Sequence, residues 1–224
     1  MFFGIQAGQS VVLSRIAREL QEDILLKKTE ERLSRHLHAD GLEKMVQDAV
    51  LAQAAARVAD DDIISIDPSD IQKPYAQEDG MPLLAKVWDG SKGRVGDNLG
   101  YNLCFATATQ SMTRRIVPLR MSVWSTKEDG FTSENDKVLE VIKSLADALG
   151  RRGIYVYDRG GDGDWLFSFF IKEGLDFIVR LVGNRSLIHW NATRLAEDVA
   201  RSCPLKYAQN VRSEERRVGK ECTA

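Results

Sequence analysis

The chain has 224 residues, of which 43% are hydrophobic and 29% are charged. These values exclude a disordered protein and predict one main folded domain with a smaller accessory part. A formal net charge of -2 lacks the basic character that marks many nucleic-acid-binding domains. Three cysteines without close spacing argue against a disulfide framework and against a zinc site. No apolar run approaches the ~18 residues of a membrane span, so we expect a cytoplasmic protein.

The first 59 residues are predicted to form a small helical region. Apolar residues recur at helical spacing after Ser10, Thr29 begins a second segment that ends near Leu37, and residues 41–59 are rich in alanine. The pattern predicts three short helices. Acidic and basic residues balance here, so a DNA-binding role for this region remains open without support from its charge.

After Asp60 the pattern changes to strands. Four strands are predicted first, near 63–67, 83–88, 101–109 and 115–124, followed by a helix at 134–149, a strand at 154–158, a helix at 163–173 and a strand at 176–182. The helix at 134–149 has the clearest limits, because Ser133 and Asp136 form a capping box and Gly150 suits its C-terminal cap. This order predicts a mixed α/β sheet with flanking helices.

Two of the predicted strands end on an aspartate. "IISIDPSDIQK" carries Asp67 and "GIYVYDRGGDGDWLF" carries Asp158. Each could be a solvated turn residue, since Asp and Gly are common in turns. Together they favour another interpretation, because two carboxylates brought to one edge of a sheet repel each other unless cations lie between them. Carboxylates suit Mg²⁺, with Mn²⁺ as an alternative ion, and the matching chemistry is two-metal phosphodiester cleavage.

Other polar residues support weaker hypotheses. Asp70 could replace Asp67 as a ligand, although a surface role suits it better. Lys73, Arg180 and Arg185 lie near predicted strand ends and could contact DNA phosphates. A solvated basic side chain explains each of these three equally well.

Six segments of the sequence, in order, carry a resemblance to a known family. They are "SIDPSDIQKPYA", "DGSKGRVG", "RIVPLRMSVWS", "SENDKVLEVIKSLADALG", "GIYVYDRGGD" and "DFIVRLVGNRSL". The chain resembles the DDE transposases of bacterial insertion sequences from residue 1 to about residue 195. The resemblance implies a ribonuclease H-like catalytic domain, DNA cleavage and strand transfer at element ends, transposon-end and target DNA as partners, and a homodimer in the intact protein. It also implies that Asp67 and Asp158 are the first two catalytic acids and bind Mg²⁺.

The family has a third acid that this chain does not match. The family supplies a Glu from a late helix, and no Glu after Arg180 has the family's spacing. Glu197 follows the last predicted strand too soon, whereas Glu214, Glu215 and Glu221 lie in the final segment. We therefore expect residues 60–211 to be a partial catalytic domain, which would be inactive alone. A metal-dependent nuclease of the same fold and a non-catalytic DNA-binding fragment are the alternatives.

The final segment has its own resemblance. "RSEERRVGKEC", residues 212–222, is identical to the translation of a common sequencing-library adapter read in one frame. We therefore expect residues 212–224 to be a non-native tail, and we assign its basic residues no part in nucleic-acid binding.

Overall fold

The computed structural model describes residues 2–76, 81, 83–89 and 94–203. The chain divides into two compact units, Met1–Val179 and Arg180–Ala224. Each unit is described by itself. The tail predicted at 212–224, with Glu214, Glu215 and Glu221, lies outside the described residues. None of the described helices is long and apolar enough to cross a membrane.

The first unit begins with helices, as the sequence predicted, but the described residues contain four before the first strand. They are α1 (Phe2–Gly8), α2 (Leu13–Leu20), α3 (Leu26–Leu37) and α4 (Leu42–Ala55). A left-handed residue, Gln9 at φ 46°, follows α1 and separates it from α2. Buried Ile16, Ala17 and Leu33 form a small core of their own in α2 and α3. Leu51 and Ala54 of α4 belong instead to the main core.

The sheet of the first unit is mixed. Its strands are β1 (Ile63–Gln72), β2 (Ala85–Asp89), β3 (Arg94–Thr109), β4 (Ile116–Trp124), β5 (Ile154–Tyr157) and β6 (Asp176–Val179). The order is β2-β3-β1-β5-β6, with β4 also paired to β3. The pairings of β1 with β5 and of β5 with β6 are parallel, and those involving β3 are antiparallel. This arrangement confirms the predicted mixed α/β class and is consistent with a ribonuclease H-like fold.

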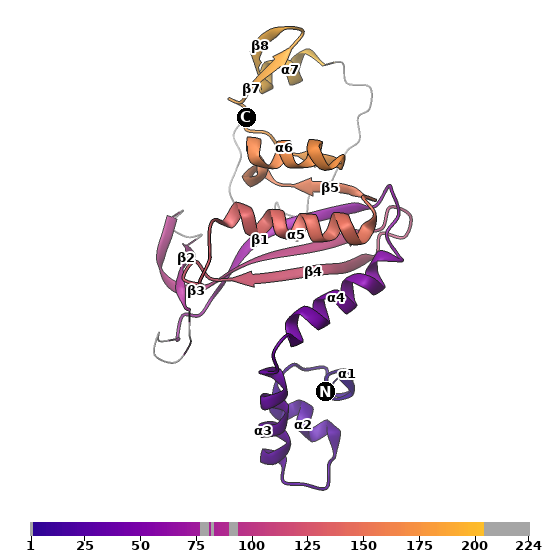
Figure 1. Cartoon of the computed structure of the whole chain (residues 1–224), viewed down its shortest axis with the longest axis vertical. Coiled ribbons are helices and arrows are strands. Elements are labelled where there is room, and N and C mark those ends of the chain that lie inside the picture. The colour runs from indigo at the N-terminus through magenta and orange to yellow at the C-terminus, as the bar shows by residue number, and fades with distance from the viewer. Residues whose placement is uncertain (1, 77–80, 82, 90–93, 204–224) are drawn as a thin grey trace, which may run out of the picture. The chain divides into compact units, whose positions relative to one another are not determined.

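Two helices follow β4 and complete the core. Helix α5 (Glu134–Leu149) lies across one face of the sheet (Figure 1), and its Ile142 and Leu145 are fully buried with Ile64 of β1. The predicted caps are present, because Ser133 Oγ accepts a hydrogen bond from the Asp136 N–H at 3.1 Å and Gly150 has φ 62°. Helix α6 (Asp164–Glu173) places Phe170 against Tyr155 and stacks it on Phe177 at 4.9 Å.

Strand β1 continues past its predicted end at Asp67 to Gln72. Pro68 lies inside the strand, where it still pairs with Cys104 of β3. Strand β5 stops pairing with β1 at Ile66, so β1 is a free edge on that side from Asp67 onward. Proline is tolerated at such an edge, which explains why this proline does not end the strand.

The second unit, from Arg180, contains elements that the sequence analysis did not predict. Its described part forms a hairpin of β7 (Ser186–His189) and β8 (Ala192–Leu195), followed by helix α7 (Ala196–Ser202). The strand predicted through residue 182 ends at Val179. No glycine marks the hairpin turn, which is why the sequence pattern did not reveal it.

Candidate active site

Asp67 and Asp158 lie at the same level of two neighbouring strands. Ile66 of β1 pairs with Tyr157 of β5 in a parallel register, and each aspartate follows one of these two residues. Parallel strands bring equivalent ends to one edge of a sheet. Strand pairing therefore places the two backbone positions side by side, as the sequence analysis expected.

Asp67 lies on the face of β1 opposite the buried core. Side chains alternate along the strand, so Ile64 and Ile66 are buried beneath the helices while Asp67 is exposed. Its partner on β3 is Phe105, whose side chain is 40% exposed. Within the described ranges, no Lys or Arg forms a salt bridge with the Asp67 carboxylate. Among the described residues, the Asp67 carboxylate therefore has no positively charged partner in a salt bridge.

Asp158 follows the last residue of β5 and begins the next turn. It caps the short 3₁₀ helix η1 (Arg159–Gly161), and its Oδ1 accepts a hydrogen bond from the Gly160 N–H at 2.8 Å. This bond orients the carboxylate at the end of the strand and uses one of its two oxygens. Like Asp67, Asp158 forms no salt bridge with a described Lys or Arg.

Negative charge gathers around these strand ends. Burial is the largest of the causes that raise the pKa of the Tyr157 hydroxyl. Negative charge on Cys104, Asp158, Asp67 and Glu134 raises this pKa by successively smaller amounts. Burial, followed by the charge of Asp67, raises the pKa of the Cys104 thiol to about 12. Both groups therefore stay neutral at ordinary pH.

A cavity of about 740 Å³ opens beside Asp158. It includes Asp70 and Asp158 but not Asp67. The other residues that line it are Pro68, Ser69, Lys86, Val87, Trp88, Asn102, Glu134, Tyr157 and Gly160. The structure thus brings Asp70 together with Asp158 in one cavity, while Asp67 is Asp158's neighbour across the strand pair.

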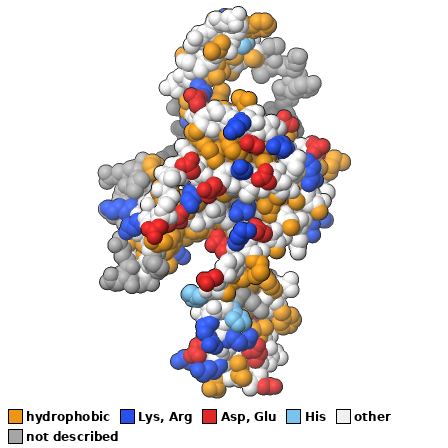
Figure 2. Space-filling model, in the orientation of Figure 1, with side chains coloured by type: hydrophobic (Ala, Val, Ile, Leu, Met, Phe, Trp, Pro, Cys, Tyr) orange, Lys and Arg blue, Asp and Glu red, His pale blue; other side chains and the backbone are white. Residues whose placement is uncertain are grey.

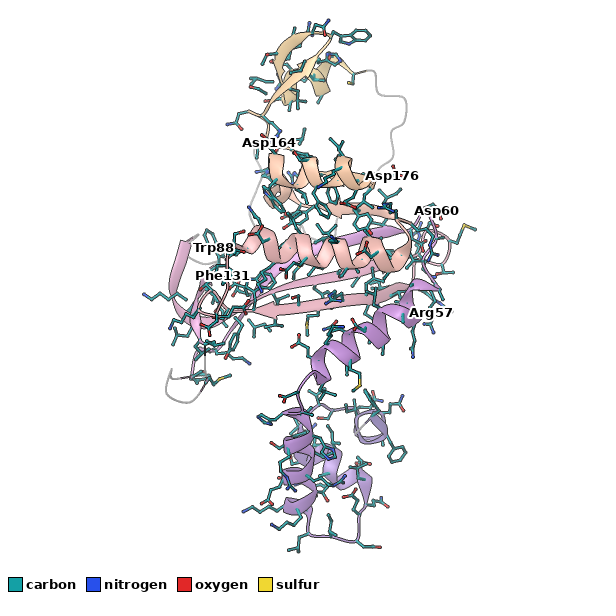
Figure 3. The ribbon with its side chains drawn as sticks, in the orientation of Figure 1. Arg57, Asp60, Trp88, Phe131, Asp164 and Asp176 are labelled. Atoms are coloured by element: carbon teal, nitrogen blue, oxygen red, sulfur yellow. The ribbon has the colours of Figure 1, made fainter. Side chains whose placement is uncertain are left out.

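Glu134 and Asn102 are cavity residues that the sequence analysis missed. The Asn102 side-chain N–H donates to Glu134 Oε1 at 2.6 Å. Helix α5 connects β4 to β5, and these two strands are parallel. The helix therefore begins at the edge of the sheet where both strands end, and this places its first residue, Glu134, at the cavity. Figure 3 labels Trp88 on β2, which lines the cavity, and Phe131, which precedes α5. The signal available in the sequence was an acidic residue at the start of a crossover helix, which resembles ordinary helix capping.

The three basic residues proposed for DNA binding are not gathered at this cavity. Lys73 follows β1 and donates its backbone N–H to Leu99 at 2.7 Å. Arg180 begins the second unit and is exposed, and Arg185 precedes β7 in the same unit. Figure 2 shows Lys and Arg side chains interspersed with Asp and Glu over the visible face of the first unit. Contacts of these three residues with DNA stay a prediction.

Among the described residues, no three His, Cys, Asp or Glu side chains are grouped closely enough to hold a metal ion. Glu197, which follows the last predicted strand too soon to match the family's third acid, lies in the first turn of α7 and forms an ion pair with Arg201. Asp67 and Asp158 offer carboxylate oxygens, which are the donors that Mg²⁺ prefers. The donor chemistry therefore fits this ion, although two acids alone make an incomplete ligand set.

Comparison with known proteins gives little further guidance. No protein-family model matches the sequence, and no curated protein matches it. Among solved structures, the Mos1 transposase paired-end complex with left transposon end is similar, with a TM-score of 0.31 and 12% sequence identity. The similarity covers 77% of this chain and 55% of that chain, so this chain spans about half of its length. Likeness at this level is too weak to assign the fold, which rests on the strand order above.

Proposed function

We propose that this chain carries part of the catalytic domain of a DDE-type transposase, which cleaves DNA with Mg²⁺ held by Asp67 and Asp158. The observation that supports the proposal is the position of these two carboxylates, which follow partner residues on adjacent parallel strands and lack salt bridges to described Lys or Arg residues. Adjacent carboxylates without a counter-charge favour the binding of cations.

The residues have separate tasks in this proposal. Bound Mg²⁺ would supply Lewis-acid activation of a phosphodiester and of the attacking oxygen. Asp67 contributes a carboxylate from a strand that β3 holds in place along its whole length. The carboxylate of Asp158 is oriented by the N–H of Gly160. These fixed positions matter because a displacement of about 1 Å can cost a hundredfold in rate.

The proposal extends to the partners and to the whole protein. Its DNA partners would be the element ends and the target, and the intact protein would act as a homodimer. The proposal leaves the third acid unassigned, since no three His, Cys, Asp or Glu side chains among the described residues are grouped closely enough to hold a metal ion. Two acids alone would bind Mg²⁺ weakly and would not support cleavage.

Metal binding by the present chain tests the proposal without requiring activity. We expect titration with Mn²⁺, followed by electron paramagnetic resonance, to detect weak binding that both Asp67→Asn and Asp158→Asn reduce. Asp70→Asn is the matched control, because Asp70 lies three residues farther along β1 and lines the cavity with Asp158. Loss of binding in Asp70→Asn with none in Asp67→Asn would contradict the assignment and move the site into the cavity.

A further inference from the structure

The hairpin of the second unit turns on two residues with unusual backbone conformations. Trp190 and Asn191 have φ 53° and 59°, and they connect the β7 partner His189 directly to the β8 partner Ala192. Two left-handed residues give the tight type I′ turn that matches the twist of a hairpin. Asn tolerates this conformation, but a bulky residue such as Trp rarely adopts it. The protein therefore carries an indole at a position where Gly or Asn would fit with less strain.

The side chains at this end of the hairpin are open to solvent. Trp190 and Ile188 are each 85% exposed, and the Trp190 ring meets only an edge of His189 at 5.7 Å among the described aromatic rings. Figure 2 shows apolar side chains at the surface of the part formed by β7, β8 and α7. Strained residues that persist at an exposed position are a feature of binding sites more often than of packing.

The unit that carries Trp190 is basic, in contrast to the chain as a whole. The described part of the second unit, residues 180–203, has four arginines and two acids, which give it a formal charge of +2, while the whole chain has -2. The arginines are Arg180, Arg185, Arg194 and Arg201. One of the two acids, Glu197, is already paired with Arg201. A small basic unit with an exposed indole has the two features that bind single-stranded nucleic acid: cations for the backbone and a stacking surface for bases.

We propose that Trp190 at the tip of the β7–β8 hairpin stacks on an unpaired base of a DNA strand, while the arginines of the same unit contact the strand's phosphates. The inference rests on the proposed function only in naming DNA as the partner. It assigns a task to a hairpin that metal-dependent cleavage does not itself require.

A second exposed apolar residue of the same hairpin provides the comparison. Ile188 on β7 is 85% exposed, as Trp190 is. Its aliphatic side chain has no π-face on which a base could stack. Ile188 is therefore the matched control for exposed apolar surface without a stacking ring.

The test is binding of a fluorescent single-stranded oligothymidylate to the full chain in EDTA, measured by anisotropy. Trp190→Gly removes the ring while keeping the left-handed turn, because glycine adopts φ > 0 freely. We expect affinity to fall about 5- to 150-fold, since loss of one stacked base costs roughly 1 to 3 kcal/mol. Trp190→Tyr should retain much of the affinity, and Ile188→Thr should bind as the wild type does. Circular dichroism checks that each variant is folded.

Unchanged affinity in Trp190→Gly would overturn the inference, as would an equal loss in Ile188→Thr. Tighter binding of duplex DNA that does not depend on Trp190 would overturn it too, by showing that phosphates alone are recognised. The Asp67→Asn variant separates this inference from the proposed function. Trp190-dependent binding should persist in Asp67→Asn, so failure of the metal site and failure of the stacking site give different results.

Discussion

Ile66 of β1 and Tyr157 of β5 are direct partners in a parallel strand pair. Their next residues are the two aspartates, so the ladder of backbone hydrogen bonds sets the level at which both acids leave the sheet. Side chains at these two positions do not hold the strands together, because the pairing is between backbone groups. The acids can therefore be replaced with little effect on the fold, and substitutions can test their chemistry.

Asp67→Asn and Asp158→Asn should each abolish the proposed DNA cleavage by the intact protein. We expect a loss of roughly a thousandfold, since a metal ion's stabilisation of the transition state is worth several kcal/mol. Asparagine keeps the acceptor oxygen that Asp158 offers to Gly160 but loses the charge that holds the cation. The measurement is nicking of supercoiled plasmid with Mg²⁺, and near-normal nicking by either variant would refute its role. Strand-transfer products would separate a transposase from a nuclease.

Local signals predicted some elements well. Helix α5 has its predicted limits because both ends depend on nearby residues, Ser133 at the start and Gly150 at the end. The adjacency of the strands that lead to Asp67 and Asp158 was expected because the proposed metal chemistry requires the two acids to converge. The limits of α5 are thus encoded within short segments, whereas the adjacency was inferred from chemistry.

Other features depend on contacts between distant residues, which the sequence pattern does not reveal. Glu134 reaches the cavity only because β4, α5 and β5 are connected as they are, and its hydrogen bond with Asn102 spans 32 residues. The hairpin at β7 and β8 was missed for a different reason, since its turn uses Trp190 where glycine is usual. Strand β1 continues past its predicted end at Asp67 because the free edge that tolerates Pro68 is a property of the assembled sheet.

Gly153→Ala should destabilise the first unit more than Gly150→Ala does. Both glycines have positive φ, 88° and 62°, so alanine strains the backbone at each. A Cβ at Gly153 would also lie 2.5 Å from Ile64 Cδ1, whereas one at Gly150 would meet nothing within 4 Å. We expect a loss of about 1 kcal/mol at Gly150 and roughly 2 to 4 kcal/mol at Gly153. Urea unfolding measures both, and equal losses would show that Ile64 moves aside.

Cys104 should resist alkylation in the folded protein, while Cys203 reacts. Burial raises the pKa of the Cys104 thiol to about 12, so almost no thiolate forms at pH 8.5, and Cys203 is exposed. Mass spectrometry after iodoacetamide treatment, with and without urea, distinguishes the two sites. Rapid modification of Cys104 in the absence of urea would show that the strands open readily.

The same shift predicts a dependence of stability on pH. The unfolded chain releases the Cys104 proton near the ordinary pKa of 9.0, and the folded chain holds it until about 12. Between these values the unfolded state binds fewer protons, so the free energy of unfolding falls as pH rises. Urea midpoints from pH 8 to 10.5 should therefore fall more steeply for the wild type than for Cys104→Ala. Parallel profiles would contradict the assignment.

Arg152→Met should destabilise the first unit through loss of a bridge between two helix ends. The Arg152 guanidinium donates to the carbonyl oxygens of Leu149 at 2.7 Å, Ala55 at 2.9 Å and Val58. Leu149 ends α5 and Ala55 ends α4, so one positive charge satisfies carbonyls at the negative ends of two helix dipoles. Methionine retains part of the apolar stem but leaves these partly buried carbonyls without their donor.

We expect a loss of about 2 to 4 kcal/mol in the free energy of unfolding, because hydrogen bonds from a charged donor contribute about 1.5 to 3 kcal/mol each and are not additive. Arg151→Met is the matched control. The Arg151 side chain is 59% exposed and reaches only Glu173, so its loss should cost less than about 1 kcal/mol. Urea denaturation followed by circular dichroism gives both values. If the two variants were equally stable, the other contacts of α4 with the sheet, such as the hydrogen bond from the Met121 N–H to Gln47 Oε1 at 3.1 Å, would suffice to hold the helix, and the Arg152 guanidinium would contribute nothing.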